Sequence, residues 1–447
     1  MSTTMTAVDR DQTSIAFENL ARELATNGPE SVRQLRLRAI ERFSELGFPT
    51  VKLEEWRFTN VAPIARTEFD LQPEHGGIVL GDLVPYRYDD SLQLTAVNGH
   101  LIPEFSDLRC LPDGVTVCSL ADCLENHPEM VEGLLGQFAR FEEHAFVALN
   151  TALFQDGVFV HVPKGVFVEQ PINLVNIVRP TADRPLAVFP RNLFVAEESS
   201  QVTLVEQFAT VGEGRYLTSP VTEVVVRDNA VVDHYKLQRE SIDAFHMATF
   251  QIQLGRDGNF SSHSISWGGG LVRNDVNAVL AGEGSEATLN GLYMVEGQQL
   301  VDNHMRVDHA APHCDSHELY KGILEGKSRA VFNGRIYVHP GAQKTDAKQT
   351  NRNLLVSPDA LCNSNPQLEI FADDVKCTHG STVGQLDEVA IFYLRSRGIG
   401  EEAAKSLLTY AFAADIVERI KVKPVRRDLE EFLFRRLPKG DIVRQAV

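Results

Sequence analysis

One thiol and one imidazole lie two residues apart near the end of the chain, at Cys377 and His379. Residues two apart on a strand face the same side, so the two groups project together if this segment is extended. Thiolate and imidazole suit iron and zinc, and an iron site or cluster takes about four ligands. The pair would therefore serve a metal only if a second chain completed the set. The alternative is a solvent-facing pair without a function.

The other cysteines carry no standard cluster motif. Cys118 and Cys123 are five residues apart, and a ferredoxin pattern would need another cysteine at position 126, which is Asn126. No C-x-x-C occurs among the six cysteines of the chain. Cys110, Cys118 and Cys123 are better explained as buried structural thiols. We expect no stable iron–sulfur cluster that this chain holds alone.

The densest set of candidate metal ligands is His304, His309, His313, Cys314 and His317. Their spacing matches no standard zinc pattern, and a proline interrupts the segment. We favour histidines that bond to backbone or solvent over a metal site.

A glycine-rich segment, Gly322–Ser328, resembles a phosphate-binding loop. Three residues separate its glycines where the motif needs four, and the residues that follow predict a strand rather than a helix. Without a helix N-terminus the loop lacks the free N–H groups that hold phosphate. No nucleotide site is expected in this chain, so any ATP hydrolysis would belong to another subunit.

Composition excludes several function classes. The 447 residues include 43 Lys and Arg against 61 Asp and Glu, a formal net charge of −18. An acidic chain is a poor candidate for binding nucleic acid or an anionic membrane surface. No apolar run approaches the roughly 20 residues that span a bilayer, and residues 1–15 lack the apolar segment of a secretion signal. Sparse cysteines fit the reducing cytosol, which is the compartment we expect.

The elements that position these residues fall into three regions. Residues 1–150 combine helical and mixed patterns, including a predicted helix over residues 128–149. Residues 151–385 alternate short β-branched runs with turns. Residues 386–447 predict three helices, the first with Asp387 as its N-cap, the second over residues 401–420 and the third after Pro424.

The middle region predicts a repetitive β architecture. Gly255, Gly268, Gly282 and Gly297 follow one another at intervals of 13, 14 and 15 residues, one strand and one turn for each step. No long helical pattern interrupts more than 200 residues, which excludes alternating strands and helices. A sandwich or barrel stays open, and the near-regular spacing favours a solenoid.

Several segments carry a resemblance to a known family. The chain resembles the SufB/SufD family of iron–sulfur cluster assembly scaffolds, and its SufD branch most closely. SufB usually has a Glu-His-Glu segment where this chain has Cys377-Thr378-His379-Gly380, and often has an N-terminal cysteine cluster that is absent here. The matching segments are Gly47-Phe48-Pro49-Thr50 with Glu54-Glu55-Trp56-Arg57-Phe58-Thr59, residues 156–165, Leu319-Tyr320-Lys321-Gly322, residues 366–380 and residues 392–399.

The resemblance implies a fold and a set of partners. It implies a right-handed parallel β-helix, mainly β, flanked by helical N-terminal and C-terminal regions. It also implies a non-catalytic scaffold that pairs with a SufB paralogue and is worked by SufC, an ABC-type ATPase. A transient iron–sulfur cluster would form at the shared SufB–SufD interface; whether a flavin binds is left open.

The resemblance also suggests site residues. His379 matches the histidine proposed to face a SufB cysteine across the nascent cluster, with Cys377 and Cys362 as further candidates. The C-terminal helices of the family bind SufC, so candidate docking residues are Leu407, Tyr410, Phe412 and Asp415.

Two other hypotheses stay open at this point. A secreted-type β-helix carbohydrate-active enzyme would use paired carboxylates, which an Asp- and Glu-rich chain can supply. The lack of a signal segment and the C-terminal helices count against it. A homodimer is a further alternative for the isolated chain, because exposed strand edges tend to pair.

Overall fold

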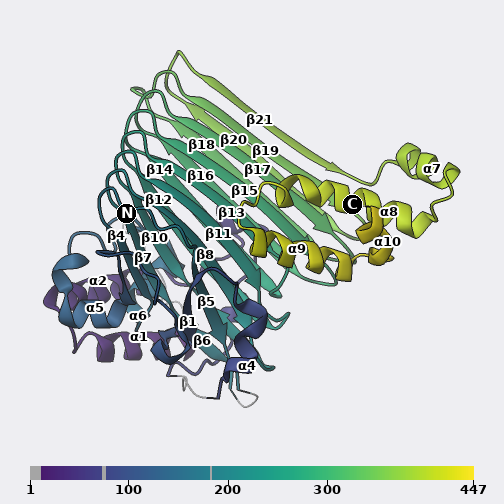
Figure 1. Cartoon of the computed structure of the whole chain (residues 1–447). Helices are drawn as coiled ribbons and strands as arrows, with labels where there is room; N and C mark the ends of the chain where they lie inside the picture. Colours follow the sequence, from purple (N-terminus) through teal and green to yellow (C-terminus); the bar gives the residue numbers. More distant parts are fainter. Residues whose placement is uncertain (1–11, 73–76, 182–183, 447) are drawn as a thin grey trace, which may run out of the picture.

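The computed structural model describes residues 12–72, 77–181 and 184–446 (Figure 1). The prediction that residues 1–15 lack the apolar segment of a secretion signal concerns mainly residues 1–11, which lie outside the described residues. The core is a parallel β-solenoid in which the chain passes alternately between two sheets. This confirms the predicted solenoid and excludes the sandwich and barrel.

One sheet has eleven strands and the other has ten. Nine strands of the first sheet follow one path, and β6 and β9 lie beside it. The eleven-stranded sheet comprises β3 (Thr116–Ser119), β4 (Val158–Val162), β6 (Leu186–Val188), β7 (Arg191–Ala196), β9 (Tyr216–Thr218), β10 (Val221–Val226), β12 (Ala244–Leu254), β14 (Leu271–Leu280), β16 (Leu300–His309), β18 (Arg329–Val338) and β20 (Leu361–Ile370). The ten-stranded sheet comprises β1 (Leu92–Val97), β2 (His100–Leu101), β5 (Ile172–Val178), β8 (Gln201–Thr210), β11 (Val231–Arg239), β13 (Asn259–Ser266), β15 (Glu286–Val295), β17 (Asp315–Leu324), β19 (Asp346–Leu355) and β21 (Lys376–Gly384).

Each turn of the solenoid adds one strand to each sheet, and we call such a pair of strands a rung. Successive rungs stack in register, so each inward side chain lies over its equivalent in the previous rung. Val232 of β11 pairs with Phe260 of β13, which pairs with Ala287 of β15, and all three are fully buried. A rung thus buries its apolar side chains only when another rung covers it. The same stacking explains why strands repeat at the glycine spacing seen in the sequence.

Helices of the N-terminal region cover the outer face of the eleven-stranded sheet. Phe17 of α1 and Phe43 of α2 pack in one apolar cluster with Phe189 and Leu217 of the solenoid. The region also adds strands, because β1 pairs in parallel with β5 and β3 pairs antiparallel with β4. Its helices are α1 (Gln12–Leu24), α2 (Glu30–Leu46), η1 (Glu54–Trp56), α3 (Ala62–Ala65), α4 (Leu80–Leu83), η2 (Val84–Tyr86), η3 (Pro103–Phe105), α5 (Leu120–Asn126), η4 (Pro128–Met130) and α6 (Ala145–Leu153).

The prediction of one helix over residues 128–149 is wrong. That segment is helical only in η4 and at the start of α6, and Gly133 and Gly136 between them have φ angles of 75° and 73°. The buried carboxylate of Glu223 accepts the N–H groups of Gly136, Phe138 and Ala139. A solenoid carboxylate therefore determines the loop that helical periodicity alone could not exclude.

The three predicted C-terminal helices are confirmed, and a short fourth follows them. Asp387 caps α7 by accepting the N–H of Val389 at 2.8 Å. The helices α8 and α9 lie on the outer face of the ten-stranded sheet, where Trp267 stacks on Phe432 with ring centroids 4.5 Å apart. Figure 1 shows α7 standing away from the solenoid. The bounds are α7 (Glu388–Ser396), α8 (Glu401–Val417), α9 (Lys423–Arg436) and α10 (Gly440–Ala446).

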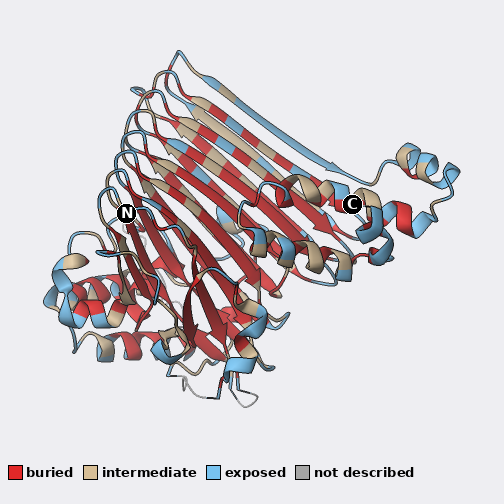
Figure 2. Ribbon diagram, in the orientation of Figure 1, coloured by how far each residue is buried: buried red, intermediate tan, exposed pale blue. Residues whose placement is uncertain are grey.

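The last rung, formed by β20 and β21, has no further strand above it among residues 12–72, 77–181 and 184–446. Neither strand contains a buried residue, whereas the strands below them are largely buried (Figure 2). We call the inward face and the free edges of these two strands the open end of the solenoid.

Candidate functional site

Strand register places His379 and Cys377 on the inward face of the open end. Cys377 pairs with Ala347 and His379 with Gln349, and both partners in β19 are buried inside the solenoid. Thr378 pairs with the exposed Lys348 and faces outward. The prediction that Cys377 and His379 share a face is confirmed, and that face looks into the interior of the solenoid.

The two groups differ in exposure. Cys377 packs partly against the apolar cluster of Ile336, Val338 and Ala347, and burial raises the pKa of its thiol. His379 is exposed because no rung covers it. The imidazole is therefore the accessible ligand of the pair.

Cys362 also faces inward, but at the other end of the rung. It pairs with the buried Ala330 and packs against the central apolar core, and burial raises the pKa of its thiol to about 12. Cys377 belongs to a separate apolar cluster. The structure does not bring the two cysteines together in one ligand set.

A pair of serines crosses the open end between these cysteines. The hydroxyl of Ser381 in β21 donates to the hydroxyl of Ser364 in β20 at 2.7 Å. Ser364 in turn donates to Oδ1 of the buried Asn351 at 2.8 Å. This closes the centre of the last rung with polar groups, which the sequence pattern did not single out.

A buried polar column lies beneath His379. Gln349 is one rung below and Glu318 of β17 is two rungs below, with 1% and 3% exposure. Nε2 of Gln349 donates to both carboxyl oxygens of Glu318 at 3.2 Å. Burial raises the pKa of Glu318 to about 8, since no basic side chain pairs with it in the described part of the chain.

The free edges of the last rung carry backbone groups that no other described strand pairs with. The N–H of Lys376 bonds to the carbonyl of Thr345 in the rung below, at 2.8 Å. Because N–H groups alternate in direction along a parallel strand, those of Cys377, His379 and Ser381 point to the free edge. On β20 the same alternation places the ring of Pro366 at the free edge, a position where proline costs no ladder bond.

The histidine-rich segment does not form one site. His304 lies on the outer face beside Asp302, at 3.0 Å, whereas His309 faces inward and bonds to Ser316 at 2.8 Å. Cys314 is buried near Ser285, and His317 is exposed on β17. Within residues 12–72, 77–181 and 184–446 no group of three or more His, Cys, Asp or Glu could hold a metal ion.

The candidate docking residues of α8 face the body of the protein. Tyr410 is buried and stacks on Phe434 with centroids 5.3 Å apart. Asp415 pairs with Lys321 of β17 at 3.1 Å, and the Lys321 ammonium lies 4.4 Å from the ring centroid of Phe412. Leu407 is half-buried in the same apolar layer.

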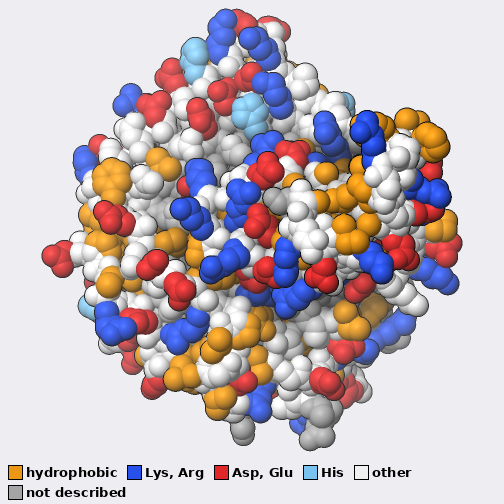
Figure 3. Space-filling model, turned by 45° about the vertical axis from the view of Figure 1, so that its right-hand side comes forward, with side chains coloured by type: hydrophobic (Ala, Val, Ile, Leu, Met, Phe, Trp, Pro, Cys, Tyr) orange, Lys and Arg blue, Asp and Glu red, His pale blue; other side chains and the backbone are white. Residues whose placement is uncertain are grey.

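The exposed apolar surface of the C-terminal region is on α7. Val389, Phe392 and Tyr393 are 74%, 71% and 56% exposed, and Ile391 is the one buried residue of this helix. Figure 3 shows hydrophobic side chains gathered on this side of the molecule. This helix was expected from its pattern, but its exposure was not.

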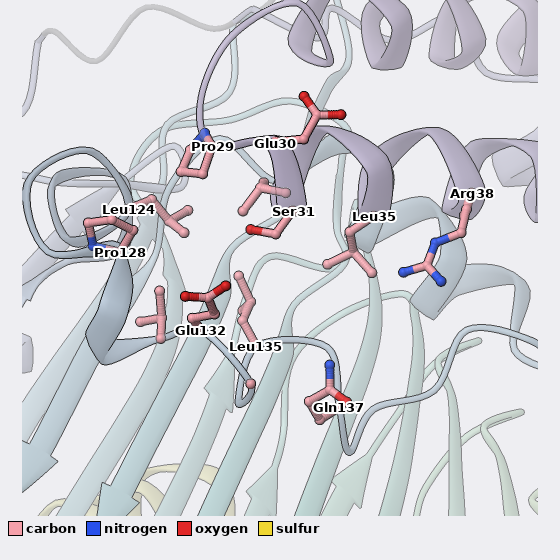
Figure 4. Close-up of a pocket in the computed structure, with 13 residues that line it drawn as sticks. Pro29, Glu30, Ser31, Leu35, Arg38, Leu124, Pro128, Glu132, Leu135 and Gln137 are labelled. Carbon is pink, nitrogen blue, oxygen red and sulfur yellow. The ribbon is translucent and has the colours of Figure 1, made fainter.

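Two of the cavities in the described part of the chain are large, and both lie away from the candidate residues. One of about 420 Å³ lies between the start of α2 and the loop around Val131, with Leu35 and Leu135 in its wall (Figure 4). The other, about 920 Å³, lies between the loop around Arg140 and the outer face of β12, β14 and β16. None of the seven predicted site residues lines either cavity.

No helix in the described part of the chain is long and apolar enough to cross a membrane.

Comparison with known proteins identifies the family to which the chain is similar. Residues 178–412 match the SufBD core domain of the SUF system for iron–sulfur cluster assembly, and residues 10–174 match the N-terminal region of SufBD proteins. The chain is 32% identical over 409 residues to the iron–sulfur cluster assembly protein SufD of Escherichia coli, covering 90% of this chain and 92% of that protein.

Other relatives give the same result. An iron–sulfur cluster assembly SufBD family protein of Synechocystis is 32% identical over 410 residues, covering 88% of each chain. The SufD protein of Bacillus subtilis is 29% identical over 430 residues, covering 92% of this chain and 94% of the relative. The chain belongs to the SufBD family of iron–sulfur cluster assembly proteins.

Proposed function

We propose that this chain is a SufD-type scaffold subunit, without catalytic activity of its own, that pairs with a SufB-type paralogue through the open end of the solenoid. A nascent iron–sulfur cluster is its cargo and forms at the shared interface. His379 supplies one ligand, and Cys377 and Cys362, which lie in separate apolar clusters, are alternative further candidates. The paralogue supplies the rest.

The observation that carries this proposal is the uncovered last rung. It combines an accessible imidazole, free strand edges and exposed apolar side chains such as Val383. One imidazole and one half-buried thiol make an incomplete ligand set, so a cluster at this position requires a second chain. An uncovered strand edge is also a surface that another strand can extend. A homodimer through the same edges is our proposal for the chain when no paralogue is present.

A SufC-type ATPase docks, in this proposal, on the C-terminal helices. The apolar face of α7 provides contact area, and Leu407, Tyr410, Phe412 and Asp415 fasten α8 to the solenoid and to α9. The docked subunit would pull on a helix that is tied to the strands. No observation favours a carbohydrate-active enzyme.

Pairing through the free edge can be tested with Val383→Pro. The N–H of Val383 points to the free edge, so proline removes an edge donor without breaking a bond inside the solenoid. Losing one or two hydrogen bonds should weaken association with the co-expressed paralogue about tenfold. Val383→Ala is the control, because it shortens the same side chain and keeps the N–H. Equal affinity of the two variants, measured by titration calorimetry, would contradict pairing through this edge.

A further inference from the structure

The polar column below His379 places the side-chain amide of Gln349 where it can select the tautomer of the imidazole. His379 and Gln349 are in-register neighbours on the same inward face, and neighbouring strands lie about 4.8 Å apart. The side chains are therefore adjacent, with Gln349 buried and His379 exposed above it.

The direction of the Gln349 amide is fixed from below. Its Nε2 donates to both oxygens of Glu318, so the amide nitrogen is committed to the interior of the solenoid. Gly334 of β18 leaves the space that the amide occupies, because a Cβ at that position would lie 2.4–2.6 Å from the amide atoms.

The other end of the amide has no partner. Oε1 of Gln349 is buried and accepts no hydrogen bond from any described residue. An unpaired buried carbonyl oxygen costs free energy, and a ring N–H directly above it would remove that cost. Histidines that bind metals usually donate their second ring N–H to a carbonyl or carboxylate, which fixes the tautomer.

We propose that Gln349 is a positioning residue for His379: its carbonyl oxygen accepts one ring N–H and leaves the other ring nitrogen free to bind iron at the interface. Glu318 contributes by holding the amide in that orientation. The iron-binding half of this inference rests on the proposed function. The fixed tautomer does not, because it depends only on groups of this chain: the His379 ring and the unpartnered Gln349 oxygen below it.

The test is the tautomer of His379 in the full-length chain labelled with ¹⁵N-histidine. Long-range ¹H–¹⁵N correlation spectra distinguish the two tautomers, and His379→Ala identifies the signal. We expect one dominant tautomer in the natural chain and a mixture in Gln349→Met, which keeps the side-chain volume and loses the amide. Ser381→Ala, on the same face of the same strand, is the matched control and should leave the signal unchanged.

A second pair of variants covers the case in which Gln349→Met does not fold. Glu318→Gln keeps an oxygen that accepts from Nε2 and should preserve the dominant tautomer, whereas Glu318→Leu removes both acceptors and should release it. A His379 signal that is the same in the natural chain, Gln349→Met and Glu318→Leu would overturn the inference. A signal that Ser381→Ala shifts as far as Gln349→Met would do so too.

Cluster yield on the complex with the paralogue separates this inference from the proposed function. Loss of a group that orients a metal ligand typically weakens binding about 10- to 100-fold, so Gln349→Met should lower the yield at limiting iron. A changed tautomer with unchanged yield would support Gln349 as the positioning residue but contradict His379 as a ligand. An unchanged tautomer overturns the inference whatever the yield.

Discussion

At the scale of single residues, the open end is defined by which groups remain accessible. The exposed His379 differs from the two cysteines of the same rung, whose thiols are shielded by apolar neighbours. Burial raises the pKa of both Cys362 and Cys377, so neither thiol ionises readily by itself. Only a thiolate binds iron, and binding must therefore be coupled to loss of a proton.

This shielding predicts slow alkylation of Cys362. A pKa of about 12 instead of the reference value of 9.0 lowers the thiolate fraction at neutral pH about a thousandfold. Cys110 is the internal comparison, because it is exposed and the expectation that it is a buried thiol is wrong. Mass spectrometry after a short iodoacetamide pulse at pH 7.5 should find Cys110 modified and Cys362 intact. Similar rates at the two positions would contradict the buried environment.

Glu318 predicts a pH-dependent stability. Its carboxyl ionises near pH 4.5 in an unfolded chain and near pH 8 when folded, so its favourable contribution is present below 4.5 and is lost as the pH rises toward 8. Each unit of pKa difference corresponds to about 1.4 kcal/mol. Glu318→Gln has no such loss, and its melting temperature relative to the natural chain should therefore rise between pH 5 and pH 8.5. If the difference in melting temperature between Glu318→Gln and the natural chain is the same at both pH values, Glu318 does not have the buried environment without a basic partner that the structure shows.

At the scale of elements, strands and helices with a regular periodicity could be predicted from the sequence, whereas the irregular loop within residues 128–149 could not. Strand periodicity and glycine spacing predicted the solenoid, and the apolar stripes predicted α8 and α9. The segment 128–149 carries a helical stripe as well, but Glu223, about 85 residues later in the sequence, captures its backbone N–H groups. A long-range contact of this kind leaves no local signal.

The exposed apolar face of α7 predicts that docking of the ATPase can be weakened without loss of folding stability. Phe392 is 71% exposed, so Phe392→Ser should leave the melting temperature within about one degree of the natural value. The same change should reduce co-purification of the ATPase subunit several-fold, because it removes an aromatic contact. Phe167→Ser is the control, because it makes the same change at a phenylalanine that is 62% exposed and lies outside the C-terminal helices. Retention of the ATPase at the natural level by Phe392→Ser would move the docking surface away from α7.

At the scale of the whole molecule, the solenoid connects the helical layer with the open end. Strand β17 carries Lys321 on its outer face, paired with Asp415 of α8, and Glu318 on its inner face, two rungs below His379. A subunit docked on the C-terminal helices would therefore act on the strands that support the candidate site. This arrangement required the structure, because Lys321 and Asp415 are 94 positions apart.

The candidate site was predicted only in part. Residue types and spacing indicated Cys377 and His379 as a pair on one face, and the incomplete ligand set indicated a second chain. Sequence spacing could not show that Cys362 lies in a different apolar cluster, since that depends on how β20 faces β21. Nor could it reveal Gln349, because a lone glutamine becomes informative only when strand register places it under a histidine.

The most direct measurement is cluster reconstitution on this chain co-expressed with a SufB-type paralogue and a SufC-type ATPase, the partners proposed for it. His379→Ala is compared with the natural chain and with His317→Ala, an exposed histidine on the outer face of β17. Gel filtration first establishes that all three complexes assemble, and visible absorbance of the thiolate-to-iron bands then reports the cluster. We predict that His379→Ala lowers the yield at least tenfold and that His317→Ala leaves it unchanged. Equal yields in all three complexes would contradict a ligand at the open end of the solenoid and leave this chain only a mechanical role.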